Sequence, residues 1–197
     1  HRGDDENFTP GFVSVNRGKR SVVLDLKNPG AAPVLWKLIA TADVFAQNFR
    51  PGAIERLGFG SDTVLARHPE LVYLSISGVG RTGPYVKKRV YDPVVQALSG
   101  FADIQADPVS RRPKMIRTLI ADKTTAVYAS QAVLAALLAR ERSGKGQHVE
   151  VAMLDTMVTY IWPEAMAPFS KIGVEDMDAA STLHDMIFPT ADGYITL

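Results

Sequence analysis

The chain has 197 residues, 46% of them hydrophobic and 22% charged, which is the composition of an ordinary globular protein. Its formal net charge of +1 gives no general attraction to nucleic acid or to an anionic membrane surface, and no apolar run is long enough to span a bilayer. It contains no cysteine, which excludes disulfides, thiolate catalysis and sulfur-ligated metals and fits a reducing compartment. We therefore expect a cytoplasmic protein, or a protein of an organelle matrix if the source is eukaryotic.

The first part of the chain alternates expected strands with expected helices. Runs rich in β-branched residues between turn residues predict strands, and apolar residues at helical spacing predict helices. In chain order these elements are a strand at Ser21–Lys27, a helix at Ala31–Thr41, a strand at Asp43–Gln47, short helices at Pro51–Leu57 and Asp62–Arg67, and a strand at Leu71–Ser77.

The same alternation continues through the middle of the chain. It predicts a helix at Asp92–Ile104, a long helix at Ala121–Arg142, a strand at Gln147–Ala152 and a helix at Leu154–Trp162 that Pro163 ends. Residues 126–139 of the long helix are apolar on nearly every face, so we expect that helix to be buried. Near the end of the chain, Asp192-Gly193 between two short β-rich runs predicts a hairpin.

Strands that alternate with helices predict an α/β fold, with an open, mainly parallel, Rossmann-like sheet and helices on both of its faces. The alternation stops after Pro163. We therefore assign residues 1–162 to one large domain and residues 163–197 to a linker and the start of a smaller second domain. Both ends look cut, because no element begins at His1 and the last strand stops with the chain. We expect an internal piece of a longer protein.

Gly78–Gly83 match the pattern GxGxxG and follow an expected strand. A dinucleotide site also needs a helix that opens at these glycines, so that its N-terminus holds the pyrophosphate. The next residues, Pro84–Arg89, do not predict a helix. We therefore expect a loop at the carboxyl end of the strand, where open α/β sheets bind their ligands, rather than a nicotinamide or flavin site.

Basic residues gather in this loop and in a separate patch earlier in the chain. Arg81 and Lys87–Arg89 lie in the glycine-rich segment, and Arg50 and Arg56 flank Pro51-Gly52. They form either ordinary solvated surface or a cradle for a polyphosphate ligand, since arginine matches the geometry of phosphate. The four histidines lack the spacing of metal ligands, so no metal site is expected.

Asp122 lies where a short apolar run gives way to the long helix. A carboxylate at a helix N-terminus faces the positive end of the helix dipole, which favours its anion. It can be a cap that accepts hydrogen bonds from backbone amides. It can also be a nucleophile, if a thioester or carbonyl group is held beside it. Asp92 is a second candidate cap, for the helix that begins near Pro93.

Several segments, in one order along the chain, resemble the class III CoA-transferases, the family of formyl-CoA transferase and carnitine CoA-transferase. The matching segments are Asn16–Lys27 (NRGKRSVVLDLK), Ala42–Val44 (ADV), Gln47–Gly52 (QNFRPG), Ser75–Tyr85 (SISGVGRTGPY), Tyr91-Asp92 with Gln96-Ala97 and Ser99-Gly100, Ser143–Gln147 (SGKGQ) and Thr190–Tyr194 (TADGY). Asp122 falls where that family carries its catalytic aspartate.

The resemblance implies that the protein moves coenzyme A from an acyl-CoA to a small carboxylic acid. Asp122 would attack the thioester, and an aspartyl anhydride and an aspartyl-CoA thioester would follow. Backbone amides near Asp122 would stabilise the tetrahedral oxyanions. Coenzyme A would be a substrate, with no permanently bound cofactor. The implied coenzyme A contacts are Leu24, Asp25, Leu26, Lys27, Asn48, Phe49, Arg50, Arg56, Arg89, Val90, Tyr91 and Asp92, with Arg56 and Arg89 as phosphate partners.

Two alternative functions stay open. The α-methylacyl-CoA racemases share the scaffold and the aspartate but carry a histidine just before the aspartate that aligns with Asp92, where this chain has Tyr91. Tyrosine, whose ordinary pKa is about 10, is a poor group for proton exchange at an α-carbon, which favours transfer. The chain can also be a CoA-binding module without chemistry. The resemblance further implies interlocked homodimers of the full protein, with no nucleic acid or membrane partner.

Overall fold

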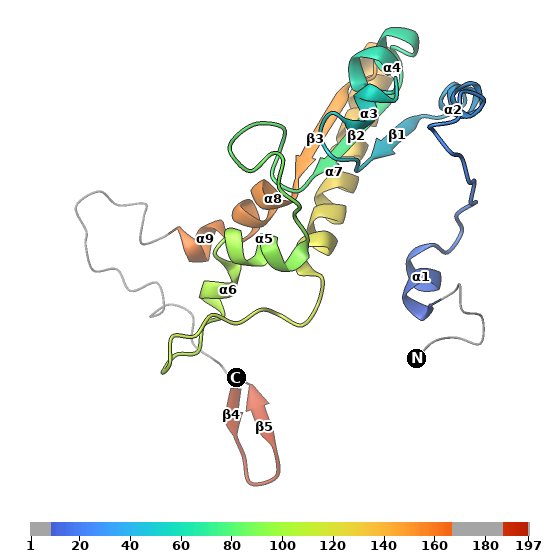
Figure 1. Ribbon diagram of the computed structural model, residues 1–197. Coiled ribbons are helices and arrows are strands. Elements are labelled where there is room, and N and C mark those ends of the chain that lie inside the picture. Colours follow the sequence, from blue (N-terminus) through green and yellow to red (C-terminus); the bar gives the residue numbers. More distant parts are fainter. Residues whose placement is uncertain (1–8, 167–186, 197) are drawn as a thin grey trace. The chain divides into compact units, whose positions relative to one another are not determined.

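A computed structural model describes residues 9–166 and 187–196 (Figure 1). The chain divides into two compact units, residues 1–40 and 41–197. In the first unit, helix α1 (Pro10–Val15) begins after Thr9, whose Oγ1 accepts a hydrogen bond from the Phe12 amide at 3.1 Å. Helix α2 (Ala31–Ile39) follows and confirms the helix expected there.

The strand expected at Ser21–Lys27 is absent, so this prediction is wrong. The backbone there is irregular and turns at residues 26 and 27, and it pairs with no strand in the described part of the chain. Val23 is 95% exposed. β-Branched residues favour an extended backbone, but a strand forms only where a neighbouring strand completes its hydrogen bonds.

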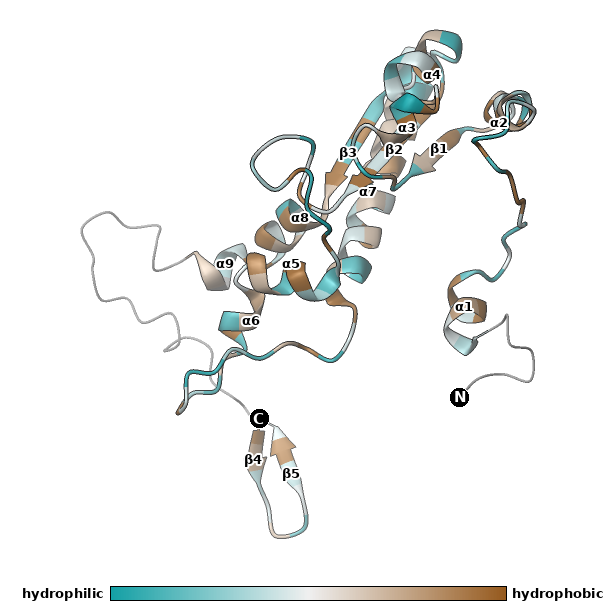
Figure 2. Cartoon of the chain, in the orientation of Figure 1, coloured by the Kyte–Doolittle hydropathy of each residue, from teal (hydrophilic) through white to brown (hydrophobic). Residues whose placement is uncertain are grey.

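The second unit contains a three-stranded parallel sheet with the strand order β1-β2-β3. Its strands are β1 (Val44–Gln47), β2 (Val72–Ser77) and β3 (His148–Ala152). The register places Val44 opposite Val72 and Tyr73 opposite His148. In Figure 2, β1 is coloured mainly as hydrophobic, whereas β3 carries both hydrophilic and hydrophobic residues. These strands and the parallel α/β class agree with the sequence-based expectation.

Helical segments connect each strand to the next, as the crossover between two parallel strands requires. Between β1 and β2 lie α3 (Ala53–Arg56) and α4 (Ser61–Arg67). Between β2 and β3 lie α5 (Asp92–Leu98), α6 (Phe101–Ile104) and the long α7 (Ile120–Ser143). After β3 come α8 (Met153–Tyr160) and α9 (Trp162–Ala165).

Two expected helix boundaries are wrong. The single helix expected at Asp92–Ile104 is broken at Gly100, whose φ of 86° lies in the left-handed region and starts α6 afresh. Pro163 does not end a helix. It lies in the first turn of α9, where proline is tolerated because its missing amide would have no helical partner.

Helix α7 is less buried than its apolar sequence predicts. Its buried residues are all small: Ala121, Thr125, Ala129 and Ala136. Its larger apolar residues are exposed: Val127 by 66%, Leu134 by 67% and Leu138 by 57%. The expectation of a buried helix is therefore wrong, because no described element of its own unit covers the outward face of α7.

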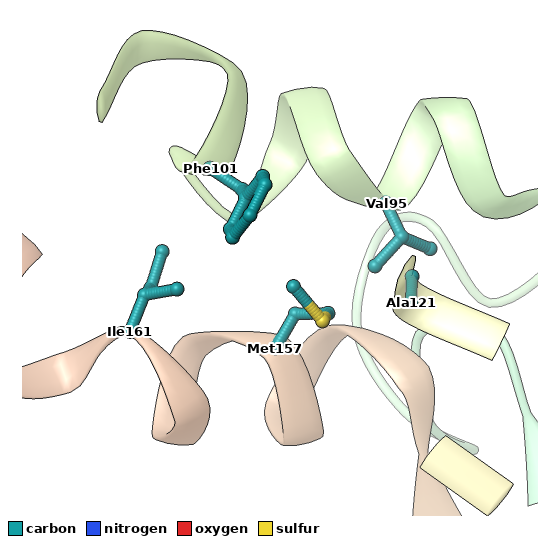
Figure 3. Close-up of a cluster of buried hydrophobic side chains, with 5 residues drawn as sticks. All are labelled: Val95, Phe101, Ala121, Met157 and Ile161. Atoms are coloured by element: carbon teal, nitrogen blue, oxygen red, sulfur yellow. The ribbon is translucent and has the colours of Figure 1, made fainter. Parts of the chain in front are cut away.

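A cluster of buried side chains joins four of the helices. Val95 of α5, Phe101 of α6, Ala121 of α7 and Met157 of α8 meet there, together with Ile161, which follows α8 (Figure 3). Because Ala121 is fully buried in this cluster, the first turn of α7 is held against α5 and α8. This packing places the residue after Ala121, which is Asp122, at a defined point in the fold.

Tyr73 anchors the sheet to the segment between α3 and α4. Its ring lies between Phe45 and His148 of the neighbouring strands, with centroid distances of 5.3 Å and 5.2 Å. Its Oη donates a hydrogen bond to the Phe59 carbonyl at 2.7 Å. Burial raises the pKa of Tyr73 to about 12, so the phenol stays protonated and keeps this bond.

We expect Tyr73→Phe to lower the free energy of unfolding by about 1–2 kcal/mol, because the buried Phe59 carbonyl loses its donor. Urea unfolding measures this loss. Tyr85→Phe is the matched control, since the Tyr85 ring is 41% exposed and we expect almost no change there. Equal stability of both variants would contradict the anchoring role of Tyr73.

The hairpin expected near the end of the chain is confirmed. Strands β4 (Ile187–Pro189) and β5 (Tyr194–Thr196) pair antiparallel, and the Thr190 amide donates to the Gly193 carbonyl at 2.9 Å. Most of the linker expected after Pro163 lies outside the described residues, so the domain boundary there stays a prediction. Within the described residues, no helix has both the length and the apolar character that a bilayer crossing needs.

Candidate active site

A cavity of about 620 Å³ opens where the strands of the second unit end. Residues 48–51 follow β1, residues 76–80 end β2 and continue beyond it, and Met153 follows β3. Residues 88–93 and the first turns of α7 complete the lining. The carboxyl ends of parallel strands are where open α/β sheets bind ligands, and the cavity lies there.

The glycine-rich segment forms a loop at this edge, as expected from the sequence. No helix opens at Gly78–Gly83, and the next helix begins only at Asp92. Packing requires a glycine at position 78, because a Cβ atom on Gly78 would lie 2.7 Å from the Cβ of Val90. The missing side chain lets the strand end and the segment before α5 approach each other beside the cavity.

Asp122 lies in the first turn of α7 and lines the cavity. Its side chain is exposed and accepts no hydrogen bond within the described residues. Desolvation raises the pKa of its carboxyl above the ordinary value, and the negative charge of Asp92 raises it further. A carboxylate that is open to a cavity and unused by the fold is available for chemistry.

The interpretation of Asp122 as a helix cap is wrong. Leu119 occupies the N-cap position, and no side chain at that position caps the helix. The carboxylate of Asp92 binds the α7 amides instead, at 2.7 Å to Ala121 and 3.1 Å to Asp122. The expectation that Asp92 caps the helix near Pro93 is also wrong, because Asp92 is part of α5 and its side chain serves α7.

The backbone amides in the first turn of α7 are already engaged. The amides of Ala121 and Asp122 donate to Asp92, the Ile120 amide to the Thr118 carbonyl, and the Lys123 amide to the Leu119 carbonyl. These four amides are therefore not free to stabilise an oxyanion, and the expected role of backbone amides near Asp122 stays a prediction. Val79, which also lines the cavity, has an amide with no hydrogen-bond partner in the described part of the chain.

Most of the residues expected to contact coenzyme A lie around the same cavity as Asp122. They are Asn48, Phe49, Arg50, Arg89, Val90, Tyr91 and Asp92. Arg56 is exposed on α3 and does not line it. Leu24, Asp25, Leu26 and Lys27 belong to the first unit, and their part in binding stays a prediction.

The charges around the cavity are mainly positive. Arg50, Lys88 and Arg89 line it, and none of them forms an ion pair within the described residues. Arg81, which the sequence placed in the same basic group, is engaged elsewhere. It binds Glu150 at 2.8 Å and Glu55 at 3.4 Å. The unpaired cations at the cavity suit an anionic ligand such as a phosphate.

The structure adds side chains that the sequence did not single out. Leu119, Thr125 and Met153 line the cavity near Asp122. Lys88 belonged to an expected basic cluster but not to the expected contacts. Met153 and Lys88 are far from Asp122 along the chain, which hides them, whereas Leu119 and Thr125 each lie three residues from Asp122, and that spacing was the available signal.

Comparison with known proteins gives one consistent result. A family model described as CoA-transferase family III matches residues 2–197. The chain is 34% identical over 201 residues to the succinate–glutarate CoA-transferase of Agrobacterium fabrum, which covers 98% of the chain and 49% of that protein. It is 39% identical over 150 residues to the acetyl-CoA:oxalate CoA-transferase of Acetobacter aceti, which covers 76% of the chain and 39% of that protein.

The fold has counterparts among solved structures. A CAIB/BAIF family protein from Brucella suis matches with a TM-score of 0.78 and 34% identity, over 91% of this chain and 48% of that one. The chain thus spans about half the length of the proteins it matches, or less.

Proposed function

Because this chain belongs to CoA-transferase family III, we propose that the full protein moves coenzyme A from an acyl-CoA to a small carboxylic acid, with Asp122 as the nucleophile. One observation carries the proposal. The Asp122 carboxylate is free of hydrogen bonds within the described residues, and it lines a cavity that also holds unpaired cations. Nucleophile and anion-binding groups therefore face the same space, as a reaction on an acyl-CoA requires.

The reaction proceeds through the Asp122 carboxylate in balanced steps. An oxygen of Asp122 attacks the thioester carbonyl, the carbon–sulfur bond breaks, and CoA thiolate leaves an aspartyl–acyl anhydride. The thiolate attacks the aspartyl carbonyl, which releases the donor acid and forms an aspartyl-CoA thioester. The acceptor carboxylate attacks that thioester and displaces the thiolate. The thiolate then attacks the acceptor acyl carbon, which frees Asp122 and the new acyl-CoA.

Other residues of the cavity are assigned to phosphate binding and to oxyanion stabilisation. Arg50, Lys88 and Arg89 bind phosphate oxygens of coenzyme A. The free Val79 amide is a candidate donor to the oxyanion of each tetrahedral intermediate. Leu24 to Lys27, Asn48, Phe49, Arg56, Val90 and Tyr91 remain proposed contacts to coenzyme A. Asp92 is not retained among them, because both of its carboxylate oxygens accept hydrogen bonds within the protein. A small dicarboxylic acid fits the names of the relatives, which specify succinate, glutarate and oxalate.

The proposal extends to the whole protein. Residues 1–162 belong to a large Rossmann-like domain, and residues 163–197 lead into a smaller one. The full protein forms an interlocked homodimer in the cytoplasm. The exposed apolar residues Val127, Leu134 and Leu138 of α7 support only a further packing surface on this helix, since such a stripe is normally covered in the assembled protein.

We expect a covalent CoA adduct on Asp122 when the full protein is incubated with a panel of acyl-CoAs. The adduct is a thioester, so hydroxylamine should remove it. Mass spectrometry of the tryptic peptide that contains Asp122 measures both properties and reports which donors are accepted. The adduct should be absent in Asp122→Asn.

Other outcomes would redirect the assignment. Deuterium incorporation at the α-carbon of a 2-methylacyl-CoA, with no acceptor acid present, would indicate a racemase. Tight binding of coenzyme A without turnover of any donor and acceptor pair would indicate a binding module without chemistry.

A further inference from the structure

Asp92 and Gln96 form a buried polar pair on α5. They lie one helical turn apart, and only 3% and 2% of their surfaces are exposed. Val95, which precedes Gln96 in α5, belongs to the apolar cluster in which it meets Ala121 of α7 (Figure 3). A buried carboxylate is costly unless hydrogen bonds replace its lost water, so the partners of Asp92 explain what it does.

Both oxygens of the Asp92 carboxylate accept hydrogen bonds. Oδ2 accepts from the amides of Ala121 at 2.7 Å and Asp122 at 3.1 Å, and Oδ1 accepts from Gln96 Nε2 at 2.6 Å. Amides in the first turn of a helix have no partner within that helix. Asp92 supplies one from α5, 29 residues before Ala121. It thus serves as the N-terminal cap of a helix to which it does not belong.

Gln96 orients the Asp92 carboxylate through its contact with the second carboxylate oxygen. Its Oε1 accepts from the Ile116 amide at 3.1 Å, so its Nε2 points to Asp92, with a longer contact of 3.4 Å to the Thr118 carbonyl. Gln96 and the α7 amides therefore present donors to the same group. A carboxylate accepts on both sides, whereas an asparagine amide would direct its NH₂ toward a donor.

We propose that Asp92, oriented by Gln96, is a positioning residue that caps α7 in place of Asp122 and so leaves the Asp122 carboxylate free in the cavity. The inference rests on the proposed function, in which Asp122 is the nucleophile. An acidic residue in the first turn of a helix ordinarily interacts with the amides there. Here Asp92 occupies the amides of Ala121 and Asp122, and the Asp122 side chain accepts no hydrogen bond within the described residues.

The pair has an electrostatic consequence as well. The charge of Asp92 adds to desolvation in raising the pKa of Asp122, and a more basic carboxylate is a stronger nucleophile once ionised. On α7 itself, Lys123 is turned to Thr118, where its Nζ donates to Oγ1 at 2.6 Å. The other titratable groups that line the cavity are Arg50, Lys88, Arg89 and Tyr91.

Asp92→Asn in the full protein tests the inference. The variant keeps the size of the side chain but removes the charge, so the pKa of Asp122 falls and the acid limb of the kcat profile moves to lower pH. The disturbed first turn of α7 lowers kcat by about ten- to a hundredfold, while KM for the acyl-CoA stays within about twofold. Steady-state kinetics across pH measure all three quantities.

Two further variants complete the experiment. Gln96→Leu keeps the charge of Asp92 but removes the amide that orients it, so we expect a lower kcat with the acid limb at its original pH. Asp103→Asn changes an exposed carboxylate on the neighbouring α6 and is the matched control, with the rate and pH profile of the unmodified protein. Thermal unfolding of each variant reports whether it is folded.

The outcomes separate this inference from the proposed function. A folded Asp92→Asn protein with unchanged kcat, or with a reduced kcat and an unmoved acid limb, would overturn the positioning role. If Asp92→Asn does not fold, an unchanged kcat in Gln96→Leu would overturn it instead. Failure of the proposed function has a different signature, because Asp122→Asn would then retain transfer.

Discussion

Asp122→Asn in the full protein is expected to reduce CoA transfer by at least about a thousandfold. An amide oxygen is a far weaker nucleophile than a carboxylate, so the first anhydride does not form. The substitution keeps the size of the side chain, and Asp122 makes no hydrogen bond that it would break within the described residues. Exchange of label between an acyl-CoA and a free acid measures the loss.

The same variant is expected to be as stable as the unmodified protein or slightly more stable. The pKa of Asp122 is raised in the folded state, so ionisation is less favourable there than in the unfolded chain. Folding stability therefore falls as the pH rises from the ordinary aspartate pKa through the raised pKa of the folded state, and asparagine removes that penalty. Loss of activity with an unchanged or higher unfolding temperature would thus report lost chemistry rather than a lost fold.

Asp155→Asn is the matched control for this substitution. Asp155 is exposed and occupies the third position of α8, as Asp122 does in α7. We expect it to transfer coenzyme A at the unmodified rate. Equal activity of the Asp122 and Asp155 variants would show that Asp122 is not the nucleophile.

Gly146→Ala is expected to lower the free energy of unfolding by about 3 kcal/mol, because the new methyl group has no space. A Cβ atom at Gly146 would lie 1.9 Å from the carbonyl oxygen of Leu71 and 2.3 Å from its carbonyl carbon. Both atoms belong to the backbone beside β2, so no side-chain rotation relieves the overlap. The Gly146 amide also donates to the Pro69 carbonyl at 2.8 Å, which holds the two segments together. Urea unfolding measures the change.

Gly144→Ala, only two positions away, separates steric overlap from backbone strain. Gly144 ends α7 with a φ of 69°, and a Cβ atom there would meet nothing within 4 Å. Its replacement should therefore cost only about 1 kcal/mol, the cost of a left-handed conformation for a residue with a side chain. The larger effect at Gly146 reflects the close approach of the segment before β3 to the segment before β2. Similar losses at both positions would contradict that explanation.

Local patterns in the sequence were enough to predict the elements that surround the site. The β-rich run at Leu71–Ser77 and the long Ala/Leu helix after Asp122 both form, and Asp192-Gly193 turns the hairpin. These elements depend on residues a few positions apart, whose preferences are local. The family could also be predicted from the sequence, because its motifs occur in the same order along this chain, and the comparisons confirm the family.

The tertiary structure decided what depends on distant residues. Ser21–Lys27 has the composition of a strand but no described partner to pair with, so it forms none. Arg81 looks like a free cation in the sequence, yet Glu150, 69 residues later, engages it. The cap of α7 comes from Asp92 rather than from its own first turn, and Asp122 is left open to the cavity. Hydrogen bonds and ion pairs of this kind form through space, and their geometry follows from packing rather than from spacing along the chain.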